Sequence, residues 1–425
     1  MIAPTQADTA GTADTGAVVM RHAAALAQHT EVPGMMTRTY LTRAHHDAAA
    51  LLARWMTDAG MHVRRDAAGN VIGRYEGAQP GAPALLTGSH FDTVRNGGHY
   101  DGNLGILLPI ACIARWHREG RRFAHAIEVI GFAEEEGVRF KATLLGSRAV
   151  AGTFDASVLD RRDDAGISMR EAMAAAGFDA SALPAAAYRR GDVLAFVEVH
   201  IEQGPVLLDA GLPLGVVTAI SGASRFMVQA SGLAGHAGTV PMGLRRDAAM
   251  TAAEIGLYIE RRCGGTPGLV GTVGVLEVPD GAANVVPGKA VFTIDIRAEQ
   301  DAVRQAAVAD VLREMEAVAA RRNVALAVNQ THDAASVPCA PWLQAQLEQA
   351  IAAQGLPVRL LPSGAGHDAM AVAALTDVAM LFVRCGNGGI SHHPDETMTA
   401  ADAQAAADVL ACFVENFAPR TSAGA

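Results

Sequence analysis

The stretch ALLTGSHFDTVRNGGHYDGNLG, residues 84–105, passes from a short apolar run into a glycine-rich loop. The run ALL indicates a buried strand, and the turn-formers TGS that follow are expected to end it. His90, Asp92 and Asp101 come next, in the loop. α/β proteins build sites after such strands, and imidazole nitrogen and carboxylate oxygen suit zinc and its neighbours. The stretch therefore predicts a metal site, against the alternative of two turn-forming aspartates beside an ordinary loop histidine.

Two later apolar runs end in the same kind of side chain. Ala126–Ala133 is followed by three consecutive glutamates, 134–136, whose mutual repulsion a divalent cation would relieve. The alternative for this run is a solvated acidic turn. Ala195–Ile201 carries His200, which alone would indicate a core histidine. Because the pattern recurs, a shared site is favoured. Further histidines lie in glycine-rich loops beside predicted strands: His367, His392 and His393.

Composition narrows the class of protein. A chain of 425 residues is longer than one hydrophobic core usually supports, so two domains are expected. Half of the residues are hydrophobic. The net charge is −10 with no basic run, which argues against nucleic acid or an anionic membrane as a partner, and no apolar run reaches the ~18 residues of a membrane span. Five scattered cysteines without a CxxC pair indicate a reducing, cytoplasmic compartment. Residues 1–16 lack a signal peptide's features and are predicted to be a frayed tail.

The middle of the chain has its own pattern of elements. Its order is β-α-β-β-α-β, the split βαβ arrangement of a ferredoxin-like domain. We therefore predict an inserted domain over 222–333, between two parts of a catalytic α/β domain at 1–221 and 334–425. The predicted elements of the insertion are the strands Arg225–Ser231, Leu269–Val278, Lys289–Ala298 and Val324–His332 and the helices Arg245–Cys263 and Asp301–Arg322.

The polar side chains of these loops match what a two-metal site needs. Such a site takes terminal ligands for each metal, a bridging carboxylate and a free carboxylate as base. Asp92 is placed to accept the second ring N–H of His90 and fix its tautomer. Spacing does not show that the loops converge, so the assignment is a hypothesis. It makes Asp101 the bridge, gives His90 and His200 to one metal and Glu136 and His392 to the other, and leaves Glu135 to deprotonate water.

Eight motifs in order carry a family resemblance over about residues 30–417. They are GSHFDTVRNGGHYDG, FAEEEGVRFKATLLGS, EVHIEQGPVL, GHAGTVPM, NVVPG, DIR, SGAGHDA and GGISHHPDE. Together they resemble the amidase/hydantoinase–carbamoylase group of the dinuclear metallopeptidases, which includes N-carbamoyl-L-amino acid hydrolases, β-ureidopropionases and allantoate amidohydrolases. The resemblance implies an α/β fold with an aminopeptidase-like mixed-sheet catalytic domain and an inserted ferredoxin-like α+β domain that acts as lid and dimerisation domain.

The resemblance also implies roles for individual residues. It implies two bound divalent ions with the same ligands as above, a ligand set that suits zinc and manganese equally. It also implies the same base, Glu135. The family usually has Asn or Ser where this chain has His393, so either histidine of the pair is a candidate ligand. His236 would polarise the scissile carbonyl. The implied substrate contacts are Gln203, Asn284, Arg297 and His367, with His236 and Asn284 acting partly across the dimer.

Two of these residues also have alternatives that do not involve substrate. Arg297 ends the strand FTIDIR, as a bidentate carboxylate clamp could, but an ordinary salt bridge is the competing interpretation. His236 is flanked by glycines, which is equally typical of a flexible exposed loop.

The resemblance implies a dimeric amidohydrolase that cleaves a carbamoyl or ureido C–N bond of a small carboxylate. The wording HYDG, EEEGVRFKATLLGS and RRDAAM is most similar to allantoate amidohydrolases. An N-carbamoyl-L-amino acid hydrolase or β-ureidopropionase is the alternative, and a dipeptidase a more distant one. A catalytically inactive scaffold would be expected to lack ligands, whereas every expected ligand is present.

Overall fold

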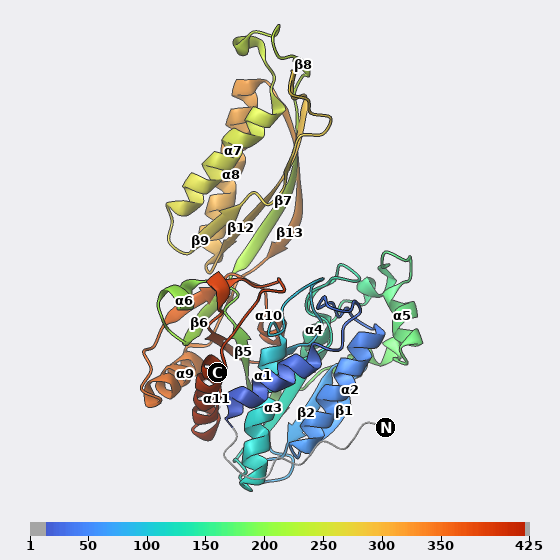
Figure 1. The fold of residues 1–425 in the computed structure, drawn as a ribbon, viewed down its shortest axis with the longest axis vertical. Helices are drawn as coiled ribbons and strands as arrows, with labels where there is room; N and C mark the ends of the chain where they lie inside the picture. The colour runs from blue at the N-terminus through green and yellow to red at the C-terminus, as the bar shows by residue number, and fades with distance from the viewer. Residues whose placement is uncertain (1–13, 421–425) are drawn as a thin grey trace. The chain divides into compact units, whose positions relative to one another are not determined.

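The computed structural model describes residues 14–420 and divides the chain into two compact units (Figure 1). Unit 1 runs to Val217 and resumes over Cys339–Leu361 and from His367 onward. Unit 2 comprises Thr218–Pro338 and Pro362–Gly366, so the predicted insertion 222–333 lies inside it. The first thirteen residues of the predicted tail lie outside the described residues. The rest of that prediction is wrong, because Asp14 caps helix α1 and the helix begins at Thr15.

Unit 1 is built on a mixed sheet, as predicted. The sheet order is β1-β2-β4-β3-β5-β16-β6-β14, and β15 also pairs with β6. By the bounds above, β14 and the last residues of β6 and β15 belong to unit 2. The four central strands β4, β3, β5 and β16 are mutually parallel, whereas β1, β2, β6 and β14 pair antiparallel with their neighbours. The strand bounds are β1 His62–Arg65, β2 Val71–Tyr75, β3 Ala84–His90, β4 Ala126–Phe132, β5 Val193–Ile201, β6 Leu214–Ile220, β14 Val337–Pro338, β15 Leu360–Ser363 and β16 Val378–Val383.

Helices flank this sheet because its central strands are apolar on both faces. Helices α1, α3 and α11 pack on one another, and α3 lies on β3 and β5, whereas α4 and α10 pack on each other and on the sheet (Figure 1). None of the helices within 14–420 is long and apolar enough to cross a bilayer. The helix bounds are α1 Thr15–Leu26, α2 Arg43–Asp58, α3 Asn103–Arg118, α4 Leu145–Ala151, α5 Met169–Ala175, α6 Val206–Asp209, α9 Pro341–Ala353, α10 Asp368–Val372 and α11 Ala400–Glu415.

Strand β5 shows how the sheet directs polar groups toward a site. Side chains alternate between the two faces of a strand. Val197, Val199 and Ile201 belong to the main apolar core, together with residues of α3 and α11. Glu198 and His200 therefore point to the opposite face, where the backbone N–H of Ala369 in α10 donates to Glu198 at 2.9 Å.

Unit 2 has the predicted ferredoxin-like topology. Its strands form the antiparallel order β13-β7-β12-β9, with β10 as a second short partner of β12, and α7 and α8 pack side by side (Figure 1). The apolar core lies between these helices and the sheet. The bounds are β7 Gly222–Ser231, α7 Ala248–Gly264, β9 Leu269–Thr272, β10 Leu276–Glu277, β12 Lys289–Ala298, α8 Asp301–Arg322 and β13 Ala325–Ala334, with β8 Gly235–His236 and β11 Val285–Val286 pairing separately.

Several predicted boundaries are wrong for identifiable reasons. Strand β3 does not stop before TGS, because each residue through His90 pairs with β4. The predicted strand Leu269–Val278 is interrupted where Val275 exchanges hydrogen bonds with Thr293. Helix α7 begins three residues after the predicted start at Arg245, because the Asp247 side chain caps it. Strand β15 lies later than the predicted strand over 357–361.

Candidate metal centre

The four parallel strands deliver the predicted ligands to one edge of the sheet. His90 is the last residue of β3 and His200 the second-to-last of β5, whereas Glu135 and Glu136 follow β4 and His392 follows β16. Because the carboxyl ends of parallel strands share an edge, these side chains converge although the sequence separates them widely.

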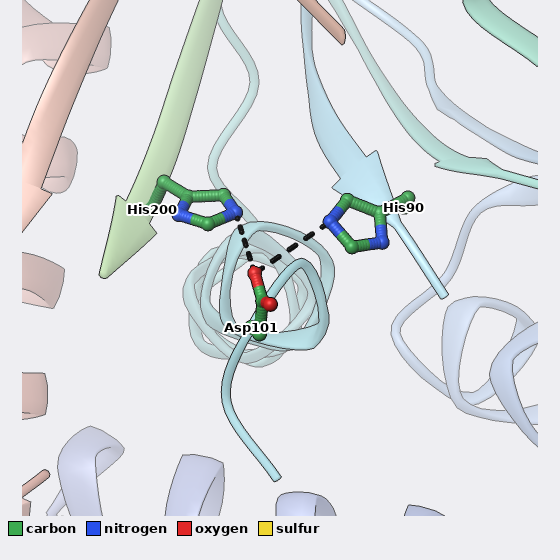
Figure 2. A group of neighbouring side chains, drawn as sticks. All are labelled: His90, Asp101 and His200. Atoms are coloured by element: carbon green, nitrogen blue, oxygen red, sulfur yellow. Dashed lines mark ion pairs between the residues drawn. The ribbon is translucent and has the colours of Figure 1, made fainter. Parts of the chain in front are cut away.

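Asp101 lies at the centre of the group. Figure 2 shows the imidazoles of His90 and His200, from neighbouring strands, both turned toward its carboxylate. Their Nε2 atoms lie 3.7 and 3.3 Å from Asp101 Oδ1. His392 Nε2 lies 3.0 Å from Oδ2 of the same carboxylate and 3.7 Å from Glu136 Oε1. One carboxylate thus faces two sets of ligand atoms, one on each oxygen.

Gly102 allows Asp101 to occupy this position. Its backbone has φ +66°, and a Cβ there would come within 2.5 Å of the His90 carbonyl oxygen and 2.6 Å of its ring. Only glycine fits such a left-handed residue in contact with another backbone segment. The Asp-Gly pair therefore turns the chain directly beneath the first histidine and into α3.

The described residues contain three groups of potential ligand atoms around this point. The atoms within each group lie within 4.8 Å of one another. A fourth group lies beside them, made of Glu198, His200 and His367. The first three are His90 with Asp101 and His200, Asp101 with Glu136 and His392, and His90 with Glu135 and Glu136.

Hydrogen bonds fix the tautomers of both strand histidines. The Nδ1 of His200 lies 2.8 Å from the Ile201 carbonyl and that of His90 lies 3.1 Å from the Asp92 carbonyl. A carbonyl oxygen only accepts, so each Nδ1 carries the proton. Both Nε2 atoms then face Asp101 Oδ1, and the Nε2 of His200 also accepts the Gly102 backbone N–H at 3.2 Å. With the proton held on Nδ1, each Nε2 is the nitrogen available to coordinate, so this arrangement fits a bound metal ion.

Asp92 supports the site more extensively than predicted. Its carboxylate lies 3.4 Å from His90 Nδ1, next to the Asp92 carbonyl that lies 3.1 Å from the same nitrogen. The same carboxylate accepts the backbone N–H groups of Glu135 at 2.9 Å and Glu136 at 3.2 Å. Asp92 therefore ties the loop after β4 to the loop after β3.

The charges of the site are unbalanced without a cation. Burial raises the pKa of Glu136 well above its usual range, and the charges of Asp101 and Glu135 raise it further. Burial likewise raises the pKa of Glu135. The Oε1 of Glu136 is buried and accepts no hydrogen bond from any residue within 14–420. Since unpaired buried carboxylate oxygens are costly, the donor set fits divalent cations of the zinc or manganese type.

Protons and metal ions compete for these groups, which predicts a pH-dependent stabilisation by metal. The folded, metal-free pKa values of Glu135 and Glu136 are raised, and the hydrogen bond to Asp101 raises the pKa of His392 to about 9. Groups with raised folded pKa values stabilise the protein below their unfolded pKa values and lose that contribution as pH rises. The metal-free protein should therefore lose stability between about pH 5 and 9, the window between those unfolded values and the raised ones, whereas metal affinity rises over the same interval.

The measurement is the melting temperature of chelator-stripped and metal-reconstituted protein across this range. We expect the difference to widen with pH and to reach about 5–10 °C at metal concentrations near 100 Kd. The pKa of Asp101 is lowered, because the neighbouring imidazoles of His200 and His392 outweigh the effect of burial, so this group titrates only below the window. A difference that stays constant from pH 5.5 to 8.5 would contradict the assignment of these groups as ligands.

The remaining predicted residues of unit 1 lie beside the same group. The Gln203 side-chain N–H donates to Asp101 Oδ1 at 3.1 Å and lies 3.2 Å from His392 Nε2. His367 is buried with its ring edge-on to His200, and burial lowers its pKa well below the usual range. His393 instead accepts the Asp395 backbone N–H at 3.2 Å. Of the two candidate histidines, only His392 joins a ligand group.

The predicted residues of unit 2 have defined surroundings of their own. His236 is exposed in the short strand β8, which pairs with β11, and Ala237 N–H donates to the Asn284 carbonyl at 2.9 Å. Arg297 is held at both Nε and Nη2 by Asp295, at 2.8 and 2.9 Å, and its Nη1 donates to the Gly364 carbonyl at 2.7 Å. The salt-bridge alternative for Arg297 thus describes its contacts in this structure.

Two buried carboxylates next to the ligands had no predicted role. Glu198 accepts from Ser89 Oγ at 2.7 Å, directly before His90. Its position two residues before His200, on the same strand face, was the available signal. Glu396 contacts the loops that carry Asp101 and His392. The only signal for it was an acidic residue in the HHPDE loop.

The chain is similar to known proteins over most of its length. Residues 86–416 match the model of the peptidase family M20/M25/M40. The chain is 42% identical over 377 residues to the N-carbamoyl-L-amino acid amidohydrolase of Geobacillus stearothermophilus, covering 89% of this chain and 92% of that one. It is 43% identical to a probable allantoate deiminase of Oryza sativa subsp. japonica, covering 90% and 84%. The crystal structure of a hydantoinase/carbamoylase-family amidase from Burkholderia multivorans matches with a TM-score of 0.88 and 32% identity, covering 94% and 97%.

Proposed function

The chain belongs to the peptidase family M20/M25/M40, and on this premise we propose that it uses two divalent cations, zinc or manganese, to hydrolyse allantoate. At the coarser level it is a hydrolase of carbamoyl or ureido C–N bonds, the chemistry that its relatives share. The observation that carries the two-cation part of the proposal is the carboxylate of Asp101, which faces His90 and His200 on one oxygen and His392 on the other. Allantoate as the substrate is supported by the 43% identity to the probable allantoate deiminase.

The proposed centre assigns ligands as the geometry groups them. His90, His200 and Asp101 would hold one ion, and Asp101, Glu136 and His392 the other. When bound, the ions would polarise the scissile carbonyl and lower the pKa of a bound water molecule. Gln203 would orient the substrate from beside Asp101, to which it already donates.

Glu135 is the proposed general base. Its backbone is fixed by the hydrogen bond to Asp92, and its side chain belongs to the ligand-sized group with His90 and Glu136. Burial raises its pKa, which moves a carboxylate toward the range where it both takes up and releases a proton near neutral pH. Glu135 would remove a proton from the attacking water and return it to the departing nitrogen.

Unit 2 supplies the proposed substrate contacts. His236 would stabilise the negative oxygen that develops on the carbonyl, and Asn284 would contact the substrate next to it. Arg297 would hold the substrate carboxylate through Nη1, which must then exchange the Gly364 carbonyl for the ligand. Asp295 keeps the guanidinium oriented for this exchange. We propose that this unit acts as the lid of the enzyme.

The second candidate substrate is an N-carbamoyl-L-amino acid, which the 42% identity to the Geobacillus enzyme favours. Both candidates present a carboxylate and a terminal ureido group, and hydrolysis of that group releases ammonia. The test is ammonia release by metal-reconstituted protein with allantoate and several N-carbamoyl-L-amino acids side by side. Rapid release from allantoate alone supports the proposal, whereas preference for a carbamoyl amino acid replaces the substrate and keeps the mechanism. If the protein bound two metal ions but released no ammonia from any of these compounds, both candidate substrates would be excluded.

We also propose that the protein forms a homodimer through unit 2. Several large apolar side chains are exposed on α7 and on the segments that precede it, as at a protein–protein interface. The 3-10 helix over 242–244 precedes α7, and Leu233 pairs with Arg246 beside it. The exposed side chains are Leu233, Met242, Leu244, Met250 and Leu257.

The dimer proposal predicts the effect of a charge on this face. Leu257 is 55% exposed on α7, so Leu257→Arg should fold normally and convert the dimer to a monomer at micromolar concentration, because an unpaired charge in an apolar interface is costly. Sedimentation velocity measures the change. Gln349→Arg, at an exposed position of α9 in unit 1, is the control. An unchanged dimer in both variants would place the interface elsewhere.

The proposal includes a cytoplasmic location. The five cysteines form no disulfide, and four of them are buried. This is what a reducing compartment permits.

A further inference from the structure

Glu396 is a buried carboxylate that the proposed chemistry does not use. It is 5% exposed and follows the loop that carries His392. Its Oε1 accepts the backbone N–H groups of Tyr100 at 2.9 Å and Asp101 at 3.2 Å. Its Oε2 accepts from Ser391 Oγ at 2.7 Å. Both oxygens of the carboxylate are thus engaged, and one side chain connects two loops that lie 295 residues apart in sequence.

The two loops that Glu396 joins each supply a ligand of the second ion. One carries Asp101 and the other carries His392, directly after Ser391. The strand histidines of the first ion are fixed by β3 and β5 themselves. His392 has no such support, because it lies in a loop with φ +55° and its side chain is 49% exposed. Its 3.0 Å approach to Asp101 therefore depends on what holds the loops together.

The packing around Glu396 is specific to this arrangement. A Cβ on Gly98 would lie 2.1 Å from Glu396 Cδ and Oε1, so the loop before Asp101 leaves room for this carboxylate. The location is also electrostatically unfavourable, because two carboxylates, Glu396 and Asp101, are buried close together. Three hydrogen bonds to the loops offset that cost, which is the expected signature of a side chain retained for geometry.

We propose that Glu396 is a positioning residue that sets the distance between Asp101 and His392 for the second metal ion. This inference rests on the proposed two-metal function. Glu396 touches neither ion nor substrate and acts through the backbone of Asp101 and through Ser391. Removal of a group that orients metal ligands typically costs 10–100-fold in metal affinity.

The first experiment is a zinc titration of chelator-stripped full-length protein by calorimetry. Wild type should bind two ions per chain. Glu396→Ala should weaken the second binding event about 10–100-fold and leave the first much less affected. Glu396→Gln should bind like wild type, because its amide oxygen can accept both backbone N–H groups and its amide nitrogen can donate to Ser391 Oγ. Thermal unfolding of the stripped variants measures any general loss of stability separately.

A second pair of variants tests the same geometry without removing the carboxylate. Gly98→Ala would push Glu396 aside and should reproduce the selective loss of the second ion. Gly97→Ala is the matched control, since a Cβ there meets Val94 and not Glu396. This pair decides the question if Glu396→Ala does not fold.

The possible outcomes distinguish the positioning role of Glu396 from the two-metal function on which it rests. Selective loss of the second ion in Glu396→Ala and Gly98→Ala, but not in Glu396→Gln and Gly97→Ala, supports the positioning role. Two ions bound with wild-type affinity in Glu396→Ala and Gly98→Ala would overturn the role and leave the two-metal function standing. A wild-type protein that binds no metal would overturn both.

Discussion

Replacement of Glu135 by glutamine is expected to lower kcat by roughly 10²–10⁴-fold while both metal ions remain bound. Glutamine preserves the size of the side chain and cannot accept a proton from water. The backbone hydrogen bond from residue 135 to Asp92 does not involve the substituted group, so the loop should keep its place. The proposed ligands are unchanged, and metal content should therefore match wild type.

The measurement combines steady-state ammonia release with metal analysis of the same preparation. Glu134→Gln is the matched control, because Glu134 is a buried neighbouring carboxylate whose contact with the Gly137 N–H an amide oxygen can keep. We expect that control to lose far less activity. Near-normal turnover in Glu135→Gln would remove Glu135 from the role of base, and loss of metal in that variant would instead make it a ligand.

Replacement of Asp101 by alanine is expected to have the larger effect. The substitution removes the one carboxylate that faces both ligand sets, so binding of both ions should weaken together. Loss of metal activation amounts to several kcal/mol of barrier, which corresponds to a fall in kcat/KM of at least about 10³-fold. Replacement of His392 alone should instead weaken mainly the binding of the second ion, because His392 belongs to only one of the ligand groups.

The zinc titration used for Glu396 also checks this prediction. Asp92→Asn provides a graded comparison, since Asp92 supports His90 without facing both ligand sets. It should cost about 10–100-fold in metal affinity. If Asp101→Ala still bound two ions with wild-type affinity, Asp101 could not be a bridging ligand and the proposed centre would have to be redrawn.

The sequence predicted most of the elements because their apolar patterns are strong. Lys289–Ala298 and Val378–Val383 have the predicted bounds, since both are alternately or wholly buried strands flanked by turn residues. The ferredoxin-like order of unit 2 follows from element sequence alone. Strand β6 was not predicted. It is a short apolar segment that pairs antiparallel at the side of the parallel core, where no following helix marks it.

The candidate site was predictable in composition but not in arrangement. Ligand types and strand ends pointed to His90, Asp101 and Glu136, yet only the sheet order brings β16 next to β5 and so His392 to Asp101. Contacts through the backbone leave little trace in sequence. The hydrogen bonds from the loop of Asp101 to Glu396 are of this kind, because any residue other than proline at position 100 could donate one of them.

The order of the nine-stranded sheet also bears on the behaviour of the protein at high concentration. An open sheet edge is a template for pairing with another chain. At one edge, β1 is only four residues long and presents Arg64 and Arg65. At the other, β14 and β15 both pair with β6, and each short strand contains a proline, Pro338 or Pro362, which has no N–H to donate. Both edges therefore resist strand-to-strand aggregation. Self-association of the protein is then expected through a specific interface, such as the apolar face proposed on unit 2, and not through open-ended sheet extension.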